Sequence, residues 1–330
     1  MTAKPVAIVT GGAGFIGSHM VDLLLERGFQ VRVVDNFVGG RESNLAHHSN
    51  NIDLSVDRID LRSLSSEASS FKDARYVFHF AGIGDIVPSI EQPLEYMSVN
   101  VQGTVHMLEA ARAARVERVI YAASSSCYGL AEVPTREDHR IDPQYPYALS
   151  KYQGEQAVLH WHRVYGLPVN SIRIFNAYGT RVRTTGAYGA VFGVFFRQKI
   201  AGRPFTVVGD GSQRRDFVYV SDVAQAFLTA AQTSKVGHIW NLGAGNPQSI
   251  NRLVELIGGQ AQYIPKRPGE PDCTWADIAR ITSDLGWKPV VAFEEGVARM
   301  MADIEYWRDA PLWDESSIEQ ATKAWFHYLG

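Results

Sequence analysis

The stretch Pro5-Val6-Ala7-Ile8-Val9-Thr10-Gly11-Gly12-Ala13-Gly14-Phe15-Ile16-Gly17 decides the fold. Its first half is a short, uncharged run rich in β-branched residues, which is typical of a strand buried on both faces. Glycines then recur at the spacing Gly-x-x-Gly-x-x-Gly, and a helical pattern follows through Val21, Leu24 and Leu25. Glycines let the backbone turn tightly and approach a pyrophosphate, which a helix N-terminus stabilises. The stretch therefore predicts the strand, turn and helix that open a dinucleotide-binding α/β domain.

A second apolar strand, residues 31–34, ends in Asp35. An acid at this position can accept hydrogen bonds from the adenosine ribose and would repel a 2′-phosphate, which predicts NAD rather than NADP. A lone glycine pattern is weak evidence, because a structural tight turn can carry the same glycines. Here every flanking element is present in the required order, and we interpret the stretch as an NAD site.

Composition excludes several classes of function. The chain has 330 residues, 45% hydrophobic and 20% charged, and can form one large α/β domain or two unequal lobes. A formal charge of −3 gives no basic surface for nucleic acid or an anionic membrane. Neither a signal peptide nor an apolar run of ~20 residues is evident, so we expect a cytoplasmic protein.

We expect no metal and no disulfide framework. The cysteines are Cys127 and Cys273 alone, which is too few for a disulfide scaffold or a metal cluster. His47-His48 and the pair His160 and His162 have no carboxylate or cysteine partner at metal-ligand spacing in the sequence.

The alternation of strands and helices continues. Residues 76–80 form a buried strand that ends at the small residues Ala81-Gly82, and a helix follows from about Pro93 to Ala114. The next strand, residues 118–123, delivers Ser124-Ser125-Ser126-Cys127-Tyr128-Gly129 at its C-terminal end. Ligands of open α/β sheets bind at the carboxyl ends of the strands, so we expect these serines to face the site.

Tyr147 and Lys151 stand four residues apart on a helix that is predicted to run to about Gly166. Their side chains project from one helix face and lean the same way. A nearby ammonium favours the phenolate, so this tyrosine is expected to exchange a proton nearer neutral pH than its reference pKa of about 10 allows. Alone, the pair favours the interpretation as an ordinary amphipathic helix. Its place after a cofactor-binding unit makes it the candidate proton-transfer centre.

The C-terminal part has a different rhythm. Residues 180–190 are rich in Gly, Thr and Arg and suggest a loop over a site. Arg215 lies in a glycine-containing turn and Arg267 in a proline loop, so a smaller lobe is expected to supply arginines to an anionic ligand. The predicted fold is a Rossmann-type doubly wound parallel sheet with a smaller C-terminal α/β substrate lobe. The predicted divisions are 1–175 for the NAD domain with 215–242 returning to it, 176–214 and 243–308 for the substrate lobe, and 309–330 for a helical tail of unknown role.

Taken together, these motifs resemble the extended short-chain dehydrogenase/reductase superfamily, and within it the nucleotide-sugar epimerase and dehydratase branch. The resemblance covers about residues 5–300 and is greatest to UDP-glucose and UDP-N-acetylglucosamine 4-epimerases. It rests on Thr10 to Gly17, Asp35-Asn36, Asn100, Ser124, Tyr147-x-x-x-Lys151, Asn176, Arg215-Asp216 and Arg267-Pro-Gly-Glu270.

The resemblance implies roles for individual residues. Ser124 and Tyr147 would hold the sugar hydroxyl that is oxidised, and Lys151 would hold the nicotinamide ribose while lowering the pKa of Tyr147. Cofactor contacts are implied for Gly11, Gly14, Phe15, Ile16, Gly17, Asp35, Asn36, Asp57, Arg58, Phe80, Ala81, Gly82, Asn100, Tyr147, Lys151 and Phe175. Substrate contacts are implied for Asp85, Ser124, Ser126, Asn176, Val191, Phe192, Thr206, Val208, Arg215, Arg267, Glu270 and Thr274.

Within the substrate set, Asn176, Arg215 and Arg267 would bind the diphosphate, Glu270 the nucleotide ribose, and the backbone around Thr206 and Val208 the base. One departure from the branch is Gly193, where many relatives carry proline next to Val191 and Phe192. Thr274 stands where a bulky tyrosine would restrict the sugar to glucose and galactose, so it leaves room for an N-acetyl group. Asp85 is an uncommon acid near the sugar and could instead indicate an unusual substrate.

The resemblance also separates the possible reactions. A 4,6-dehydratase of this branch carries an acid and a base, and a sugar-nucleotide decarboxylase carries a glutamate, at positions that here hold Ser125 and Ser126. Tyr147 is then expected to be the only acid–base residue, which favours an NAD-dependent nucleoside-diphosphate-hexose 4-epimerase acting through a transient 4-keto intermediate. The alternatives are a dehydratase or 4-oxidoreductase that releases a keto sugar, and a catalytically silent NAD-binding regulatory protein, which would not need Ser124, Tyr147 and Lys151 together. The expected partners are a nucleotide-sugar substrate of polysaccharide biosynthesis and a second copy of the chain, packed through the helices around 93–114 and 147–165.

Overall fold

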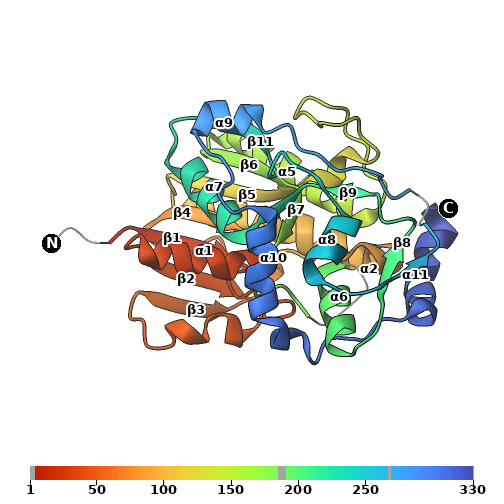
Figure 1. Ribbon diagram of the computed structural model, residues 1–330. Coiled ribbons are helices and arrows are strands. Elements are labelled where there is room, and N and C mark those ends of the chain that lie inside the picture. The colour runs from red at the N-terminus through yellow and green to blue at the C-terminus, as the bar shows by residue number, and fades with distance from the viewer. Residues whose placement is uncertain (1–3, 185–190, 267–268, 330) are drawn as a thin grey trace.

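The described residues of the computed structural model are 4–184, 191–266 and 269–329. A seven-stranded parallel sheet forms the centre of the molecule (Figure 1), with the strand order β11-β6-β5-β4-β1-β2-β3. Its strands are β1 (Val6–Thr10), β2 (Gln30–Asp35), β3 (Leu54–Arg58), β4 (Ala74–His79), β5 (Arg118–Ser124), β6 (Val169–Ile174) and β11 (His238–Leu242). The strand order reverses between β1 and β4, which places a ligand crevice at the carboxyl ends of these two strands. The predicted Rossmann-type class is confirmed.

Alternate residues of β1 face two different cores, as expected for a central strand covered on both faces. Ala7 and Val9 pack with α1 (Phe15–Glu26) and α7 (Val220–Gln232). Val6 and Ile8 pack with α4 (Gly103–Ala113) and α5 (Pro146–Tyr165) on the other face. The remaining helices are α2 (Ile86–Glu91), α3 (Pro93–Met97), α6 (Val191–Ile200), α8 (Ile250–Ile257), α9 (Ala279–Leu285), α10 (Phe293–Ala302) and α11 (Glu315–Leu329).

A third, largely aromatic core belongs to the C-terminal lobe. Phe195 stacks on Phe205 with ring centroids 5.0 Å apart, and Phe217 stacks on Phe293 at 5.1 Å. The strands here form three two-stranded pairs: β7 (Asn176–Tyr178) with β10 (Phe217–Tyr219), β9 (Arg214–Arg215) with β12 (Gln248–Ser249), and β8 (Phe205–Val208) with β13 (Ala261–Ile264). β7, β9 and β12 are too short for sequence periodicity to show.

Packing departs from the predicted domain division at α9. This helix falls within 243–308, which was predicted to belong to the substrate lobe, yet it lies against β11 of the large sheet. Ile281 and Trp287 are buried in the same core as α1 and α7. The division as a whole stays a prediction, but its 243–308 segment contributes to both parts of the molecule.

The helix expected from about Pro93 to Ala114 is interrupted by a π-helical turn. Residues 98–102 have π geometry between α3 and α4. Such turns are rare and often mark functional sites. This one carries Asn100, whose side chain is almost completely buried.

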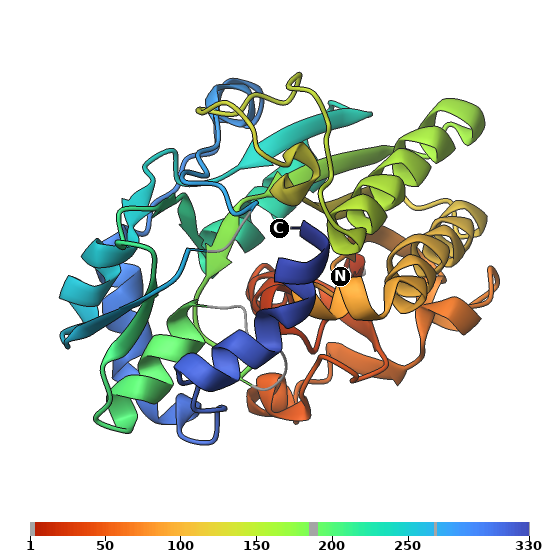
Figure 2. The ribbon, with the colours of Figure 1, turned by 90° about the vertical axis from the view of Figure 1, so that its right-hand side faces the viewer.

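The C-terminal helix α11 connects the two parts of the molecule. Ile318 near its start is buried in the aromatic core, whereas its later turns lie against α2. Figure 2 shows α11 in blue, crossing in front of the junction between the large sheet and the C-terminal lobe. The tail for which the sequence offers no role is thus part of the folded molecule. None of the described helices combines the length and apolarity needed to cross a membrane.

Candidate active site

The glycine turn after β1 fits a dinucleotide. Gly11 has φ +70°, and a Cβ added there would lie 2.6 Å from the Ala81 backbone nitrogen at the end of β4. A Cβ on Gly17 would lie 2.1 Å from the Gly11 carbonyl oxygen. Only glycine is tolerated at such contacts, so the turn is pressed against β4 with α1 starting directly behind it. Helix α1 begins with Phe15 and Ile16, and its cap residue is Gly14. Because Gly14 has no side chain, it cannot block a phosphate from the first backbone N–H groups of the helix.

Asp35 links the end of β2 to this turn. Its buried carboxylate accepts hydrogen bonds from the backbone N–H groups of Ala13, at 3.0 Å, and Phe37, at 2.8 Å. Burial raises the pKa of Asp35, and these two hydrogen bonds oppose the rise. The carboxylate is thus fixed beside the phosphate-binding turn, where a ribose would lie.

The residues predicted for the adenine end lie next to Asp35. The register of β2 and β3 pairs Val34 with Asp57 and Asp35 with Arg58. The Arg58 guanidinium lies over the Phe37 ring at 4.3 Å from its centroid. Asn36 is held by a hydrogen bond from its side-chain amide to Asp60, at 3.2 Å.

Three residues predicted to contact the cofactor have side chains that are engaged within the protein. Asn100 Oδ1 accepts from the Ile83 N–H at 2.9 Å, and its Nδ2 donates to the Ile83 carbonyl and to Ser150 Oγ. The Phe80 ring packs on Phe227 with centroids 4.5 Å apart, and Phe175 lies in a small core with Tyr128. These side chains therefore brace the crevice around the small residues Ala81 and Gly82.

Ser124, Tyr147 and Lys151 meet at the carboxyl end of β5. Ser124 is the last residue of β5, and its hydroxyl is near enough to Tyr147 to influence the pKa of the phenol. Lys151 is buried one turn further along α5, with its ammonium 4.5 Å from the centroid of the Tyr121 ring. Burial lowers the pKa of Lys151 to about 8, and the nearby Glu155 carboxylate opposes this shift. A Cβ on Gly82 would lie 3.8 Å from Lys151 Nζ. The Lys151 ammonium is therefore next to the small residues that follow β4, where the cofactor is expected.

The expected lowering of the Tyr147 pKa is wrong for this structure. Desolvation raises the pKa of Tyr147, the Ser124 hydrogen bond opposes the rise, and Asp85 adds to it. The Lys151 ammonium lies over the Tyr121 ring, and desolvation outweighs any attraction between it and the phenolate.

The expectation that Tyr147 is the only acid–base residue stays a prediction, and the Asp85 carboxylate is a second titratable group near enough to raise the pKa of Tyr147. Asp85 precedes α2, and its Oδ2 lies 3.2 Å from a guanidinium nitrogen of Arg183. Burial raises the pKa of Asp85, and Arg183 opposes the rise. Arg183 was not singled out from the sequence, although it belongs to the Arg- and Thr-rich segment that was expected to lie over a site.

A line of aromatic rings leads from Tyr147 to the C-terminal helix. The Tyr145 ring is nearly parallel to that of Tyr147, at 9° and 6.4 Å, and Trp325 of α11 lies 6.1 Å from Tyr145. Ser126 hydrogen-bonds the Tyr145 hydroxyl and accepts from Ser124 Oγ at 3.0 Å. Tyr145 and Trp325 were missed from the sequence, since only the folded chain brings positions 145 and 325 together.

A cavity of about 450 Å³ in the C-terminal lobe brings Val208, Arg215 and Glu270 together. Its lining residues are Val208, Gly209, Asp210, Ser212, Gln213, Arg215, Lys266, Glu270, Pro271 and Asp272. An Arg215 guanidinium nitrogen lies 2.7 Å from Glu270, so the predicted diphosphate ligand and the predicted ribose ligand form an ion pair. Arg267 lies outside the described residues.

Asn176 and Thr274 also lie together. Thr274 Oγ1 donates to Asn176 Oδ1 at 2.6 Å. The adjoining turn is organised by Asp216, which is fully buried and accepts backbone N–H groups of Ala244, Gly245 and Ala276. Thr274 is therefore already hydrogen-bonded to another residue predicted to bind substrate.

Two other predicted substrate contacts lie in the lobe's interior. Phe192 is buried and stacks on Tyr178 at 5.0 Å, while its neighbour Val191 is only partly buried. Thr206 is buried too, and its backbone N–H donates to Gln198, so this amide is not available to a nucleotide base.

The departure at Gly193 has a packing reason. A Cβ on Gly193 would lie 2.8 Å from the Trp307 ring. Trp307 is buried in the aromatic core, so its indole occupies the space that a larger residue on α6 would need.

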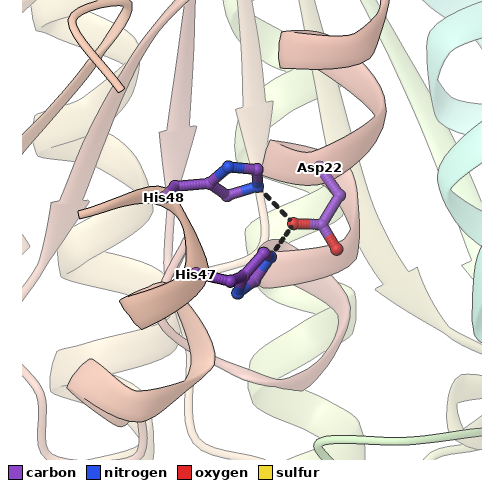
Figure 3. Close-up of side chains that lie close together, drawn as sticks. All are labelled: Asp22, His47 and His48. Atoms are coloured by element: carbon purple, nitrogen blue, oxygen red, sulfur yellow. Dashed lines mark hydrogen bonds and ion pairs between the residues drawn. The ribbon is translucent and has the colours of Figure 1, made fainter. Parts of the chain in front are cut away.

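The sequence-based expectation that His47 and His48 lack a carboxylate partner is wrong. Asp22 of α1 faces both imidazoles (Figure 3), and its Oδ1 lies 2.8 Å from each Nε2 atom. The partner was missed because 25 residues separate Asp22 from His47 in the chain.

Comparison with known proteins identifies what the chain is similar to. Residues 7–243 match the NAD dependent epimerase/dehydratase family. A UDP-glucose 4-epimerase of Mycolicibacterium smegmatis is 36% identical, over 92% of this chain and 98% of that protein. The structure of a UDP-N-acetylglucosamine 4-epimerase from Methanobrevibacter ruminantium M1, in complex with UDP-N-acetylmuramic acid, superposes with a TM-score of 0.86 at 32% identity, covering 92% of this chain and 98% of that one. A UDP-glucuronic acid 4-epimerase from Bacillus cereus, in complex with UDP-glucuronic acid and NAD, gives a TM-score of 0.85 at 28% identity, covering 91% and 99%.

Proposed function

This chain belongs to the NAD dependent epimerase/dehydratase family, and we propose that it is a nucleoside-diphosphate-hexose 4-epimerase acting on UDP-glucose or UDP-N-acetylglucosamine. The observation that carries the proposal is that Ser124 at the end of β5 and Tyr147 lie close enough for Ser124 to influence the Tyr147 pKa, with the Lys151 ammonium beside Gly82. Ser125 and Ser126 stand where elimination or decarboxylation would need a carboxylate.

Each residue then has a defined task. NAD, when bound, supplies the acceptor and later the donor of the C4 hydride. Tyr147, as the phenolate, takes the proton of the C4 hydroxyl and becomes the phenol, and it returns this proton after the 4-keto sugar has turned over. Ser124 holds the same C4 hydroxyl. Lys151 holds the nicotinamide ribose. The cavity around Arg215 and Glu270 anchors the nucleotide while the sugar rotates.

If the protein were a 4,6-dehydratase, Asp85 would be the candidate for its second acid–base group. A 4,6-dehydratase needs a second acid–base group, and the Asp85 carboxylate acts on Tyr147. Burial raises the pKa of Asp85, and the ion pair with Arg183 opposes this rise without cancelling it. Support for return of the hydride over elimination of water therefore comes from Ser125 and Ser126 and not from the charge state of Asp85.

The test is a panel of nucleotide sugars read by NMR. Purified protein with UDP-glucose or UDP-N-acetylglucosamine is expected to give the C4 epimer, with no keto sugar released. Protein boiled before addition serves as the control. Accumulation of a 4-keto product would replace the epimerase proposal with the dehydratase or oxidoreductase alternative. No turnover of any sugar, together with tight NAD binding, would favour a silent binding protein.

One observation favours a second candidate substrate, UDP-glucuronate. Arg183 pairs with Asp85, whose neighbour Gly84 lies against Tyr147, and guanidinium groups bind carboxylates in bidentate fashion. A uronate carboxylate could replace Asp85 as its partner. The same panel tests this: conversion of UDP-glucuronate that Arg183→Ala abolishes, while Arg136→Ala at an exposed ion pair does not, would support it. Equal activity of both variants would exclude it.

We also propose a cytoplasmic homodimer that supplies sugar nucleotides for polysaccharide biosynthesis. Exposed apolar residues on the helices predicted for the interface support the dimer, namely Leu94 of α3 and Leu149, Val164 and Tyr165 of α5. Light scattering after gel filtration is expected to give twice the 36.6 kDa chain mass, and Leu94→Glu with Leu149→Glu to give the single mass. A monomeric parent protein would contradict the proposal.

A further inference from the structure

Three side chains that the proposed function does not use meet on one surface of the molecule. Asp22 lies on α1, and His47 and His48 lie on the 3-10 turn Ala46–His48 (Figure 3). Both imidazole Nε2 atoms point at the same oxygen, Asp22 Oδ1, at 2.8 Å, and the three ligand atoms lie within 4.8 Å of one another. We propose that Asp22, His47 and His48 bind a divalent transition-metal ion, with Zn²⁺ the best fit.

The donor set decides the class of metal. Imidazole nitrogens suit Zn²⁺, Co²⁺, Ni²⁺ and Cu²⁺, whereas Mg²⁺ and Ca²⁺ prefer oxygen ligands alone. Zinc bonds of about 2.0–2.1 Å in tetrahedral geometry place neighbouring ligand atoms about 3.3 Å apart. The observed 2.8 Å separations need to widen only slightly to admit the ion between the two imidazoles and Oδ1. Two histidines and one aspartate leave a fourth position for water.

Arg181 fixes the carboxylate in the orientation that the site needs. Its guanidinium pairs with Asp22 Oδ2, the oxygen that faces away from the histidines, and also donates to the Asn44 carbonyl at 3.2 Å. A carboxylate that is hydrogen-bonded on its outer oxygen is the usual arrangement behind a metal ligand.

The same arginine limits the affinity. The Arg181 guanidinium lies on the other side of the Asp22 carboxylate from the proposed ion, and its positive charge repels the ion. We therefore expect weaker binding than at a closed structural zinc site. His19, which also faces Arg181 and Asp22, stays uncharged, because burial and Arg181 lower its pKa to about 4. His19 therefore adds no second positive charge that would repel the metal ion.

Solvent can reach the site. The His47 side chain is 47% exposed, and those of His48 and Asp22 are 19% and 29% exposed. An ion can therefore enter and leave without unfolding of α1. The proposal does not rest on the proposed function, because its ligands are separate from Ser124, Tyr147 and Lys151.

Calorimetric titration of untagged protein, stripped with a chelator and then dialysed, tests the site directly. ZnCl₂ is expected to bind with one equivalent per chain, and MgCl₂ to give no saturable heat. His47→Ala and His48→Ala should each weaken zinc binding at least about tenfold, the lower end of what disturbing a metal ligand costs. His160→Ala, at an exposed histidine hydrogen-bonded to Arg163 on α5, is the matched control and should bind like the parent.

Two results would overturn the site. One is the absence of saturable zinc binding to the parent protein at neutral pH. The other is parent-like affinity in both His47→Ala and His48→Ala. Asp22→Asn is informative only as a third variant, since it also breaks the pair with Arg181. Circular dichroism of each variant shows whether it is folded, and cobalt absorption of the parent and His48→Ala gives a second readout if His47→Ala is unfolded.

Discussion

In the proposed reaction, Tyr147 gains and loses a proton at a position where desolvation favours its neutral form. Desolvation raises the pKa of Tyr147, and Ser124 is the influence that opposes this rise. The pair Tyr147 and Lys151 could be selected from the sequence because helical spacing alone fixes their common face. The direction of the Tyr147 pKa shift could not be predicted from the sequence, since it depends on how deeply the folded chain buries the phenol.

Replacing Tyr147 by phenylalanine removes the proton-transfer group and keeps the ring. We expect the turnover number to fall at least about 100-fold, the scale of one general acid–base residue, with NAD binding retained. Tyr165→Phe, at an exposed position of the same helix, is the control and should keep parent activity. Steady-state kinetics with UDP-glucose would check this, and undiminished turnover in Tyr147→Phe would refute the assignment.

His79 is a buried, uncharged histidine next to the NAD turn. Its two nitrogens contact Thr10 Oγ1 at 2.6 Å and Thr104 Oγ1 at 2.9 Å, and burial together with Lys151 lowers its pKa from 6.5 to about 3. Between pH 6.5 and about pH 3, His79 is protonated in the unfolded chain and neutral in the folded chain. Folded-state stability is therefore lost as the pH falls below 6.5, and the loss continues towards pH 3.

We expect this group to contribute roughly 2 kcal/mol to the fall in unfolding free energy between about pH 6.5 and pH 4.5. Urea unfolding of the parent and of His79→Gln at both pH values measures it. The difference between the two pH values should be smaller in His79→Gln. The same pH dependence in both proteins would show that His79 is protonated in the folded state.

At the level of elements, α11 is the part that sequence reasoning could not place. The glycine turn, β1, α1 and β2 are adjacent in the chain, so local patterns predict them together. Trp325 reaches Tyr145 only because α11 returns across the junction between the two parts of the molecule. The same limitation hid the pairing of Asp22 with His47 and His48, and of Asp85 with Arg183.

Trp325→Ala is expected to disturb Tyr145, the ring next to the proposed proton-transfer residue Tyr147. Tyr145 would lose the indole against which it packs and would orient Tyr147 less well, so the turnover number should fall about tenfold or more, because small misplacements of reacting groups are costly. Trp325→Phe should restore most of it. Phe326→Ala removes the adjacent ring, which is 44% exposed, and is the matched control. Equal kinetics for Trp325→Ala and Phe326→Ala would show that α11 has no influence on Tyr147.

On the scale of the whole molecule, two binding regions lie on different cores. The glycine turn and Tyr147 belong to the large sheet, whereas the cavity around Arg215 and Glu270 belongs to the aromatic C-terminal lobe. The fold class could be predicted because alternating strands and helices leave few topologies. The boundary of the lobe could not be predicted, since α9 lies between two segments of the lobe in sequence but packs on the large sheet.

UDP alone should bind the C-terminal cavity and stabilise the protein. At 100 times the dissociation constant, a ligand specific for the folded state adds about 2.7 kcal/mol. Arg215→Ala should weaken UDP binding at least about tenfold through loss of a charged hydrogen bond. Arg252→Ala, at an exposed ion pair on α8 of the same lobe, should leave it unchanged. Thermal unfolding with increasing UDP gives both values, and equal shifts in the two variants would mean that the nucleotide binds elsewhere.

The position of α11 also bears on how the protein is made and handled. Synthesis from the N-terminus lets the large sheet and the nucleotide cavity fold before this helix has been translated. A nascent chain can therefore form its cofactor turn while the outer face of Tyr145 is still uncovered. The carbonyl of Leu329, at the end of α11, would lie 3.8 Å from a Cβ on Gly269, next to the cavity residue Glu270. A fusion partner joined after this helix would stand beside the cavity around Arg215 and Glu270, whereas one joined ahead of β1 would not.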